Sequence, residues 1–436
     1  MALGPIACWW LDQEARALLT RLARVKPFAL LMPMVPAAAS PAAQMVIERY
    51  LASGRHALRG QVYEYLRWLH GPKGRGASPA EAQRRFTFLR LRFNAVLTQF
   101  DTFADVLTQR SEHDHGVWLA GLDAVAADAL ALRGGFYEAP PVICYLDRGV
   151  GAAIRRARTR LPGGGENPVA IIRVPRERMI GSGIASSLVH EVGHQGSELL
   201  GLVKSLRPVL QGLQKGGGKA QIAWRLWERW ISEILADFWS VAKIGIASTL
   251  GLIGVVSLPR AFVFRVNMDD PHPVPWIRVR LSCAMGRLLY PHPQWESLAR
   301  LWESFYPTTG LDEERRRLLA TLEASLPGFV TLLINHRPKA LRGESLIEAM
   351  SVEERQPARL AAHYRAWRAS PSQMRAAPPS LVFAAIGQVR ADGAMSPEQE
   401  SRTLADLLTY WAQRSTLNIS AICATLPMAQ VAAPVT

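Results

Sequence analysis

The chain has 436 residues, of which 49% are hydrophobic, so it is long enough for two or three domains and is not a disordered protein. Its formal net charge is +15, almost all of the basic residues are arginine, and no dense basic run with interleaved aromatic residues stands out. We therefore expect no nucleic-acid partner. The four cysteines lie far apart without a C-x-x-C pair, which indicates buried, reduced thiols and no disulfide framework: Cys8, Cys144, Cys283 and Cys423.

Two apolar stretches resemble targeting or membrane segments. The stretch from Arg21, RLARVKPFALLMPMVPAAASPAA, has the order of a secretion signal, but it begins about twenty residues too late and contains Pro33 and Pro36 in its apolar part. Residues 244–258 are apolar, but these 15 residues are fewer than a spanning helix needs. We expect a cytoplasmic protein without firm membrane association, in which 244–258 form a buried core helix.

The N-terminal region, residues 1–137, is predicted to be helical. Apolar residues recur at three- and four-residue spacing over 44–69 and again over 80–110, as on the buried face of a helix. Residues 71–79, GPKGRGASP, are rich in glycine and proline, so they are predicted to form a loop between these two helices.

The pattern changes near residue 138. The run APPVICYLD, residues 139–147, is a strand candidate. A second candidate is VAIIRV, residues 169–174, which is rich in β-branched residues and follows a turn-forming cluster. These short apolar runs predict a sheet in the middle region of the chain, which we place at 138–310.

Two helices are predicted after the second strand, over roughly 184–203 and over 221–243. The loop between them contains QKGGGKA, residues 214–220. It resembles a phosphate-binding loop only weakly, because Lys219 is followed by alanine and not by serine or threonine. On the second helix, tryptophans at three-residue spacing indicate a core anchor and no ligand site: Trp224, Trp227 and Trp230.

The C-terminal region, residues 311–436, is again predicted to be helical. Ser396 and Gln399 are placed as a capping box at the start of its last helix. The expected fold class of the whole chain is mainly α, of the α+β kind. The predicted helices of the C-terminal region cover 311–326, 379–393 and 396–414.

Residues 190–194 read HEVGH, an instance of H-E-x-x-H that arises by chance in roughly one such chain in a hundred. On a helix, His190 and His194 lie on one face and can bind one metal ion, with Glu191 beside it. Two neutral imidazoles and an adjacent carboxylate are what a zinc hydrolase needs, because the carboxylate accepts a proton from the zinc-bound water. Gly193 is expected to leave room near the metal.

A third ligand is needed, and Glu233 in SEILADF on the next helix is the best candidate. Asp237 lies four residues later on the same face, where it can accept a hydrogen bond from the outward nitrogen of His190. Glu198 extends the stripe of His190 and His194, but one further helical turn places it about 5.4 Å along the axis. We therefore do not expect it to be a ligand.

Three motifs in this order resemble the gluzincin metallopeptidases. They are HEVGH, then E-x-x-A-D over Glu233–Asp237, then H-P-x-x-x-x-R from His272 to Arg278, and they are similar to the branch of the CaaX-prenyl endopeptidases. The resemblance implies a zincin-like core between the helical regions and a bound Zn²⁺. By this resemblance the zinc ligands are His190, His194 and Glu233, the general base is Glu191, and the residue that hydrogen-bonds a ligand is Asp237. His272 would be a second catalytic residue, which stabilises the developing oxyanion or shapes the cleft, and Arg278 would hold the cleft wall.

The chain also departs from that branch, whose members carry transmembrane helices. Residues 200–220 are too polar and too rich in glycine to span a membrane. The likeness covers only about 190–280, so the flanking helical regions have no assigned role.

The expected function is zinc-dependent hydrolysis of a peptide or protein substrate, with zinc-bound water as the nucleophile and Glu191 as the general base. The alternative is a non-catalytic binding or assembly protein that keeps a zincin fold and its zinc. His272 decides between them, because three protein ligands leave a position open for chemistry and a fourth would close the site. His272 can also be structural, since the sequence PHP recurs at 291–293 as a rigid turn.

Overall fold

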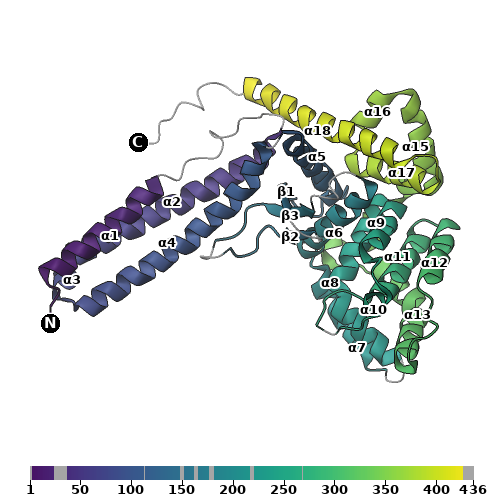
Figure 1. Ribbon diagram of the computed structural model, residues 1–436, viewed down its shortest axis with the longest axis horizontal. Helices are drawn as coiled ribbons and strands as arrows, with labels where there is room; N and C mark the ends of the chain where they lie inside the picture. Colours follow the sequence, from purple (N-terminus) through teal and green to yellow (C-terminus); the bar gives the residue numbers. More distant parts are fainter. Residues whose placement is uncertain are drawn as a thin grey trace.

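The structure, a computed structural model, describes residues 2–23, 37–111, 113–147, 152–161, 165–175, 181–216, 220–267 and 269–425. These residues are mainly helical and include one small sheet, as expected (Figure 1). Most of the secretion-like stretch, residues 24–36, lies outside the described residues.

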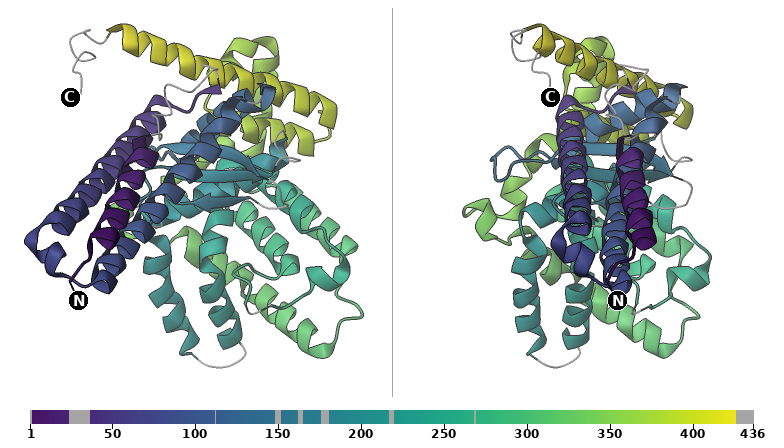
Figure 2. Two further views of the ribbon diagram at one scale, coloured as in Figure 1. Left: turned by 60° about the vertical axis from the view of Figure 1, so that its left-hand side comes forward. Right: turned by 90° about the vertical axis from the view of Figure 1, so that its left-hand side faces the viewer.

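Helices α1 (Pro5–Ala23), α2 (Pro41–His70) and α4 (Pro79–Thr108) lie side by side in a long arm (Figures 1 and 2). The prolines at the starts of α2 and α4 suit the first turn of a helix, and Ser78 caps α4 by accepting a hydrogen bond from the Glu81 amide. The two helices predicted here are therefore confirmed within a few residues. The predicted loop between them contains a short helix, α3 (Pro72–Gly76), at the far end of the arm.

The sheet has three strands in the order β1-β3-β2. Strands β1 (Val142–Asp147) and β3 (Ala170–Pro175) are parallel neighbours and match the two predicted strands. Strand β2 (Ala153–Arg155) pairs antiparallel with the other side of β3. It was not predicted, because three residues are too few for a visible alternation of apolar and polar positions.

The sheet separates two hydrophobic clusters, because successive side chains of a strand point to opposite faces. Ile143 and Ile171 face the core of the arm. The opposite face packs against the helices of the body through Val142, Cys144, Leu146, Ala170, Ile172 and Val174. Cys144 and Cys283 are buried, as predicted, and Cys8 is half-buried.

The boundaries after residues 137 and 310 remain predictions. Hydrophobic contacts cross both, because α5 (His113–Leu130) and α13 (Glu313–Ile334) contribute to the same cluster as the middle of the chain. By length and composition alone, α13 could cross a membrane. One such helix is weak evidence for a span, and 39% of its apolar window is buried inside the protein.

The helix predicted over 184–203 is two helices. Helix α6 (Ser182–Leu199) ends before Gly201, whose φ of 61° is left-handed and suits glycine. Helix α7 (Leu202–Gln214) follows directly, so the predicted loop is shorter, and residues 217–219 lie outside the described part. Helix α8 (Ala220–Ile244) agrees with its prediction.

The apolar stretch after α8 forms a mostly buried helix, α9 (Ile246–Val256), as predicted. The capping box of the last helix is also present, since Ser396 and Gln399 exchange side-chain and backbone hydrogen bonds.

The remaining helices of the body are α10 (Arg260–Val263), α11 (Pro275–Leu289), α12 (Gln294–Phe305), α14 (Leu346–Ala349), α15 (Pro357–Ala369), α16 (Pro371–Ala376), α17 (Pro379–Ala391) and α18 (Pro397–Thr425), with short 3-10 helices at Gln109–Ser111, Lys339–Leu341 and Val352–Arg355.

Candidate metal centre

Helices α6 and α8 approach each other closely because α6 presents glycine to α8. A Cβ atom on Gly193 would lie 2.8 Å from the Ala236 Cα and 2.8 Å from the Trp239 Cβ, and a Cβ on Gly196 would overlap the Trp239 ring. The expectation that Gly193 leaves room near the metal is therefore wrong. This glycine allows the two backbones to approach, and that approach brings the HEVGH helix to Glu233.

Three side chains from the two helices converge on one point. The rings of His190 and His194 have centroids 4.9 Å apart and are nearly perpendicular. Their Nε2 atoms lie 3.2 Å and 3.4 Å from the same atom, Oε2 of Glu233. Among the described residues, these three donors form the one group that could hold a metal ion, with all ligand atoms within 4.8 Å of one another.

The donors fit a zinc ion by distance and by chemistry. Oε2 of Glu233 is buried and has no hydrogen-bond partner, although both imidazole nitrogens lie close to it. Ligand atoms about 2.0–2.1 Å from a tetrahedral ion are about 3.3 Å from each other, which agrees with the two observed separations. Two imidazoles and one carboxylate are also a donor set that zinc accepts.

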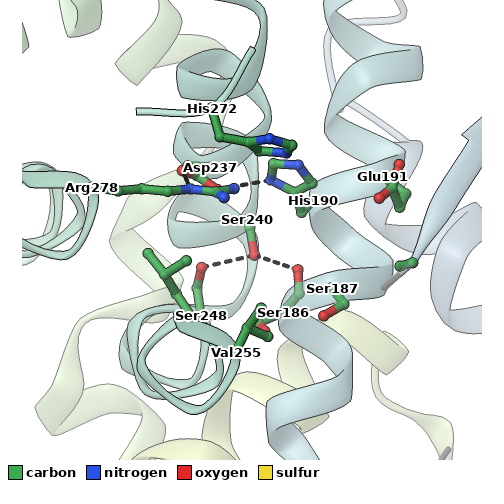
Figure 3. A pocket seen from close by; sticks show the side chains of 12 residues that line it. Ser186, Ser187, His190, Glu191, Asp237, Ser240, Ser248, Val255, His272 and Arg278 are labelled. Atoms are coloured by element: carbon green, nitrogen blue, oxygen red, sulfur yellow. Dashed lines mark hydrogen bonds and ion pairs between the residues drawn. The ribbon is translucent and has the colours of Figure 1, made fainter. Parts of the chain in front are cut away.

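Asp237 connects this group to Arg278. Its Oδ1 lies 2.8 Å from Nδ1 of His190, so the predicted hydrogen bond is present. Arg278 donates to both oxygens of the same carboxylate, at 2.7 Å and 2.9 Å (Figure 3). Because Nδ1 of His190 is engaged by Asp237, Nε2 is left to face Glu233 and a metal.

The electrostatics of this pair agree with its contacts. Burial alone would raise the pKa of Asp237, but the Arg278 guanidinium and the His190 ring outweigh it and lower that pKa well below its ordinary value. Burial would lower the pKa of His190, but the Asp237 carboxylate outweighs burial and raises it to about 9 in the metal-free protein. A bound cation would compete with that proton.

His272 also reaches the centre. Its Nε2 lies 3.2 Å from Oε2 of Glu233, and its Nδ1 lies 2.8 Å from Oδ1 of Asp270. The nearby Glu233 carboxylate raises the pKa of His272 against the opposing effect of burial. Yet the side chain is 44% exposed, compared with 12% for His190 and 14% for His194, and it is not among the mutually converging donors.

A cavity of about 210 Å³ opens beside these residues. Glu191, which is nearly buried, lines it on the other side of His190 from Asp237, as Figure 3 shows. Ala152, the residue before the edge strand β2, lines it as well. The cavity therefore brings together the predicted base, one predicted ligand, both predicted cleft residues and the start of an edge strand.

No family model, curated protein or solved structure matches this chain. The resemblance to the gluzincins therefore rests on the three motifs, and the contacts among their side chains are an independent observation.

Sequence reasoning missed the serines that line the inner part of the cavity. Ser248 donates to Oγ of Ser240 at 2.8 Å, and Ser240 donates to the carbonyl oxygen of Ser186 at 3.2 Å (Figure 3). Helical spacing could have found two of them, because Ser186 lies four residues before His190 and Ser240 lies three after Asp237. Ser248 comes from α9, so only the packing of that helix reveals it.

The remaining polar candidates lie elsewhere. Glu198 is exposed and pairs with Arg156, as expected for a residue that is not a ligand. His292 is exposed in a turn, where Nδ1 accepts a hydrogen bond from the Gln294 amide. The predicted tryptophan anchor is confirmed in part, since Trp227 and Trp230 are buried and Trp224 is half-buried.

Proposed function

We propose that this protein is a zinc metallopeptidase with a gluzincin-type site in a zincin-like core. The observation that carries the proposal is the buried Oε2 atom of Glu233, which has no hydrogen-bond partner and lies within 3.4 Å of an Nε2 atom from each histidine of HEVGH. His190, His194 and Glu233 would hold the ion. Bound zinc would supply Lewis acidity toward a peptide carbonyl and would make water a stronger acid.

Glu191 would move the protons. Its carboxylate lines the cavity directly beside His190, so it can accept a proton from the attacking water and return it to the amine that leaves. Asp237 would hold the His190 ring in one orientation and one tautomer, and Arg278 would in turn hold Asp237. The roles of Asp237 and Arg278 follow from these contacts.

His272 would act on the substrate. Its half-exposed position at the cavity allows the ring to donate a hydrogen bond to negative charge on a substrate oxygen. Asp270 orients the ring through Nδ1. This role requires that His272 does not bind the metal.

An extended peptide would pair with the edge of the sheet. Among the described residues, the free side of β2 has no neighbouring strand, and Ala152 at its start lines the cavity. An edge strand offers unpaired amide and carbonyl groups to such a peptide. Of the two edge strands, β1 and β2, it is β2 that begins beside the cavity, whereas β3, the strand directly before the HEVGH helix, lies in the middle of the sheet.

Glu191→Gln tests the proposal. Purified wild-type protein should contain close to one zinc per chain, and the variant should keep that zinc. Its kcat/KM on a mixed peptide library should fall by about 10²–10⁴, the usual contribution of a general base. Metal analysis and peptide cleavage measure the two quantities in the same preparation.

Glu198→Gln is the matched control, because Glu198 lies on the same helix but is exposed and pairs with Arg156. It should retain both zinc and activity. A wild-type protein that binds no zinc, or a Glu191→Gln variant that cleaves peptides as fast as wild type, would refute the proposal.

One contact favours an alternative, a closed zinc site in a binding or assembly protein. His272 approaches Glu233 Oε2 as closely as His190 does, at 3.2 Å, and could become a fourth ligand. Cobalt substitution separates the two possibilities. If His272 is a ligand, His272→Ala should change the visible cobalt spectrum and weaken metal binding, whereas in a peptidase it should lower activity and leave the spectrum unchanged.

A further inference from the structure

The far end of the arm carries a concentration of positive charge. Residues 55–92, here called the distal hairpin, comprise the end of α2, all of α3 and the start of α4. They contain two acidic residues, Glu64 and Glu81, and nine basic ones, so nine minus two gives +7 of the chain's +15. The basic residues are Arg55, Arg59, Arg67, Lys73, Arg75, Arg84, Arg85, Arg90 and Arg92.

The fold creates this concentration. Along the sequence the nine basic residues are separated by apolar and small residues, so no single run is dense. Because α2 and α4 lie antiparallel on either side of α3, the two halves of the segment lie next to each other (Figure 2). Eight of the nine side chains are exposed, and Arg55 is half-buried.

Exposed apolar residues lie at the same end. The first turns of α1 present Ile6, Trp9 and Trp10, which are 83%, 60% and 53% exposed. The opposite face of α1 is buried in the arm. His70, at the end of α2, lies 2.8 Å from Asp12, and this contact places the two tryptophans beside the distal hairpin.

Helix α4 adds a mixed apolar and basic stripe. Phe88 and Leu91 are 66% and 57% exposed, and they lie between the exposed Arg84 and Arg92 at three- and four-residue spacing. Bulky apolar side chains that gather on one exposed surface are typical of an interaction site.

We propose that the distal end of the arm docks on an anionic membrane surface. Tryptophan and other bulky side chains enter the interface of a bilayer, while arginines contact phosphate groups of the lipids. Each basic residue near an anionic bilayer contributes about 1 kcal/mol of attraction, which falls with added salt. A nucleic acid would satisfy the arginines, but it would leave the aliphatic side chains of Ile6 and Leu91 in water.

The shape of the arm suits peripheral docking without a span. Helices of 30 residues, such as α2 and α4, reach about 45 Å, so the tip can contact lipid while the body remains in water. This inference is independent of the metal centre and of any hydrolytic activity.

Co-sedimentation of the full chain with vesicles tests the inference. Vesicles of phosphatidylcholine with added phosphatidylserine should bind the protein at low salt, and phosphatidylcholine alone should bind it at least tenfold more weakly. Two double variants should each weaken binding to the anionic vesicles by about tenfold or more: Trp9→Ala with Trp10→Ala, and Arg84→Gln with Arg92→Gln.

Matched control variants come from the body. Phe262→Ala with Phe305→Ala removes two aromatic rings that are 51% and 59% exposed, and Arg365→Gln with Arg368→Gln removes two exposed charges from α15. Both should bind like wild type. All four variants should unfold near the wild-type temperature.

Three results would overturn the inference. They are a wild-type protein that does not bind anionic vesicles at low salt, arm variants that bind as well as the controls, and retention on single-stranded RNA without binding to vesicles. The last result would assign the basic surface to a nucleic acid.

Discussion

The candidate metal centre and the distal hairpin carry charge in opposite ways. In the centre, the nearly buried carboxylate of Asp237 is held by both His190 and Arg278. In the hairpin, nine basic residues stand against only two acidic ones, and eight of the nine basic side chains are exposed. A buried charge is tolerated only with a partner in good geometry, whereas an exposed one costs little. The charges at the centre therefore hold the side chains of His190 and Arg278 in place, whereas the exposed charges of the arm can bind a partner molecule.

Removing one buried partner should have the largest effect. Asp237→Ala leaves the Arg278 guanidinium buried without its carboxylate, and loss of one member of a buried pair costs about 3–5 kcal/mol. It also frees Nδ1 of His190, so zinc affinity should fall by about 10–100-fold. Urea unfolding measures the first effect, and competition with a zinc chelator measures the second.

An exposed pair of similar geometry provides the control. Arg133 donates to both oxygens of Glu354 at 2.7 Å, but the two side chains are 69% and 37% exposed. Glu354→Gln should cost less than about 1 kcal/mol and leave zinc binding unchanged. If Asp237→Ala and Glu354→Gln lowered the free energy of unfolding equally, burial would not explain the importance of the Asp237 carboxylate.

The close approach of α6 and α8 should produce the next largest effect. Gly193→Ala places a methyl group 2.8 Å from the Ala236 Cα, so the helices must separate, at a cost of about 1–3 kcal/mol. Zinc affinity should fall as well, because the histidines lie on α6 and Glu233 lies on α8.

Gly212 on α7 is the matched control, since a Cβ there meets nothing within 4 Å. Gly212→Ala should be neutral or should stabilise by up to about 1 kcal/mol, because alanine is the better helix former. If Gly193→Ala were also stabilising, the contact between α6 and α8 would not limit the geometry of the centre.

Motifs with a fixed helical spacing were predictable from the sequence, and features that depend on packing were not. Four-residue spacing placed His190 with His194 on one helix face and Glu233 with Asp237 on another. The contact of His190 with Asp237 was expected from the usual partner of a histidine that binds a metal. The role of Gly193 was misjudged, because it depends on Ala236 and Trp239 across the helix interface. Ser248 was missed for the same reason.

The distal hairpin shows the same limit on the surface. Its basic residues are scattered along the sequence, and only the antiparallel pairing of α2 and α4 gathers them. The tryptophans of α1 join them through the contact of Asp12 with His70, which are 58 residues apart. A sequence scan for a basic run cannot detect a surface that three separate helices build.

A buried base in the body should show an effect that depends on pH. Lys243 is 6% exposed, and its Nζ donates to the carbonyl oxygen of Ala131 at 2.7 Å. Burial, with a further contribution from the Arg355 charge, lowers the pKa of Lys243 to about 7. In the unfolded chain this pKa returns to about 10.4, so above pH 7 the unfolded state binds the proton more tightly. Stability should therefore rise with pH across this window.

Between the two pKa values, Lys243 should make the free energy of unfolding rise by up to about 1.4 kcal/mol per pH unit. Urea unfolding of wild type and Lys243→Met at about pH 7 and about pH 9 isolates it, because every other titration is common to both proteins. Wild type should gain stability relative to the variant as pH rises, whereas replacement of the exposed Lys204 by methionine should leave the profile parallel to wild type. If the stability of Lys243→Met changes with pH in parallel with that of wild type, Lys243 is charged in the folded protein. Burial would then not distinguish Lys243 from the exposed basic residues of the arm.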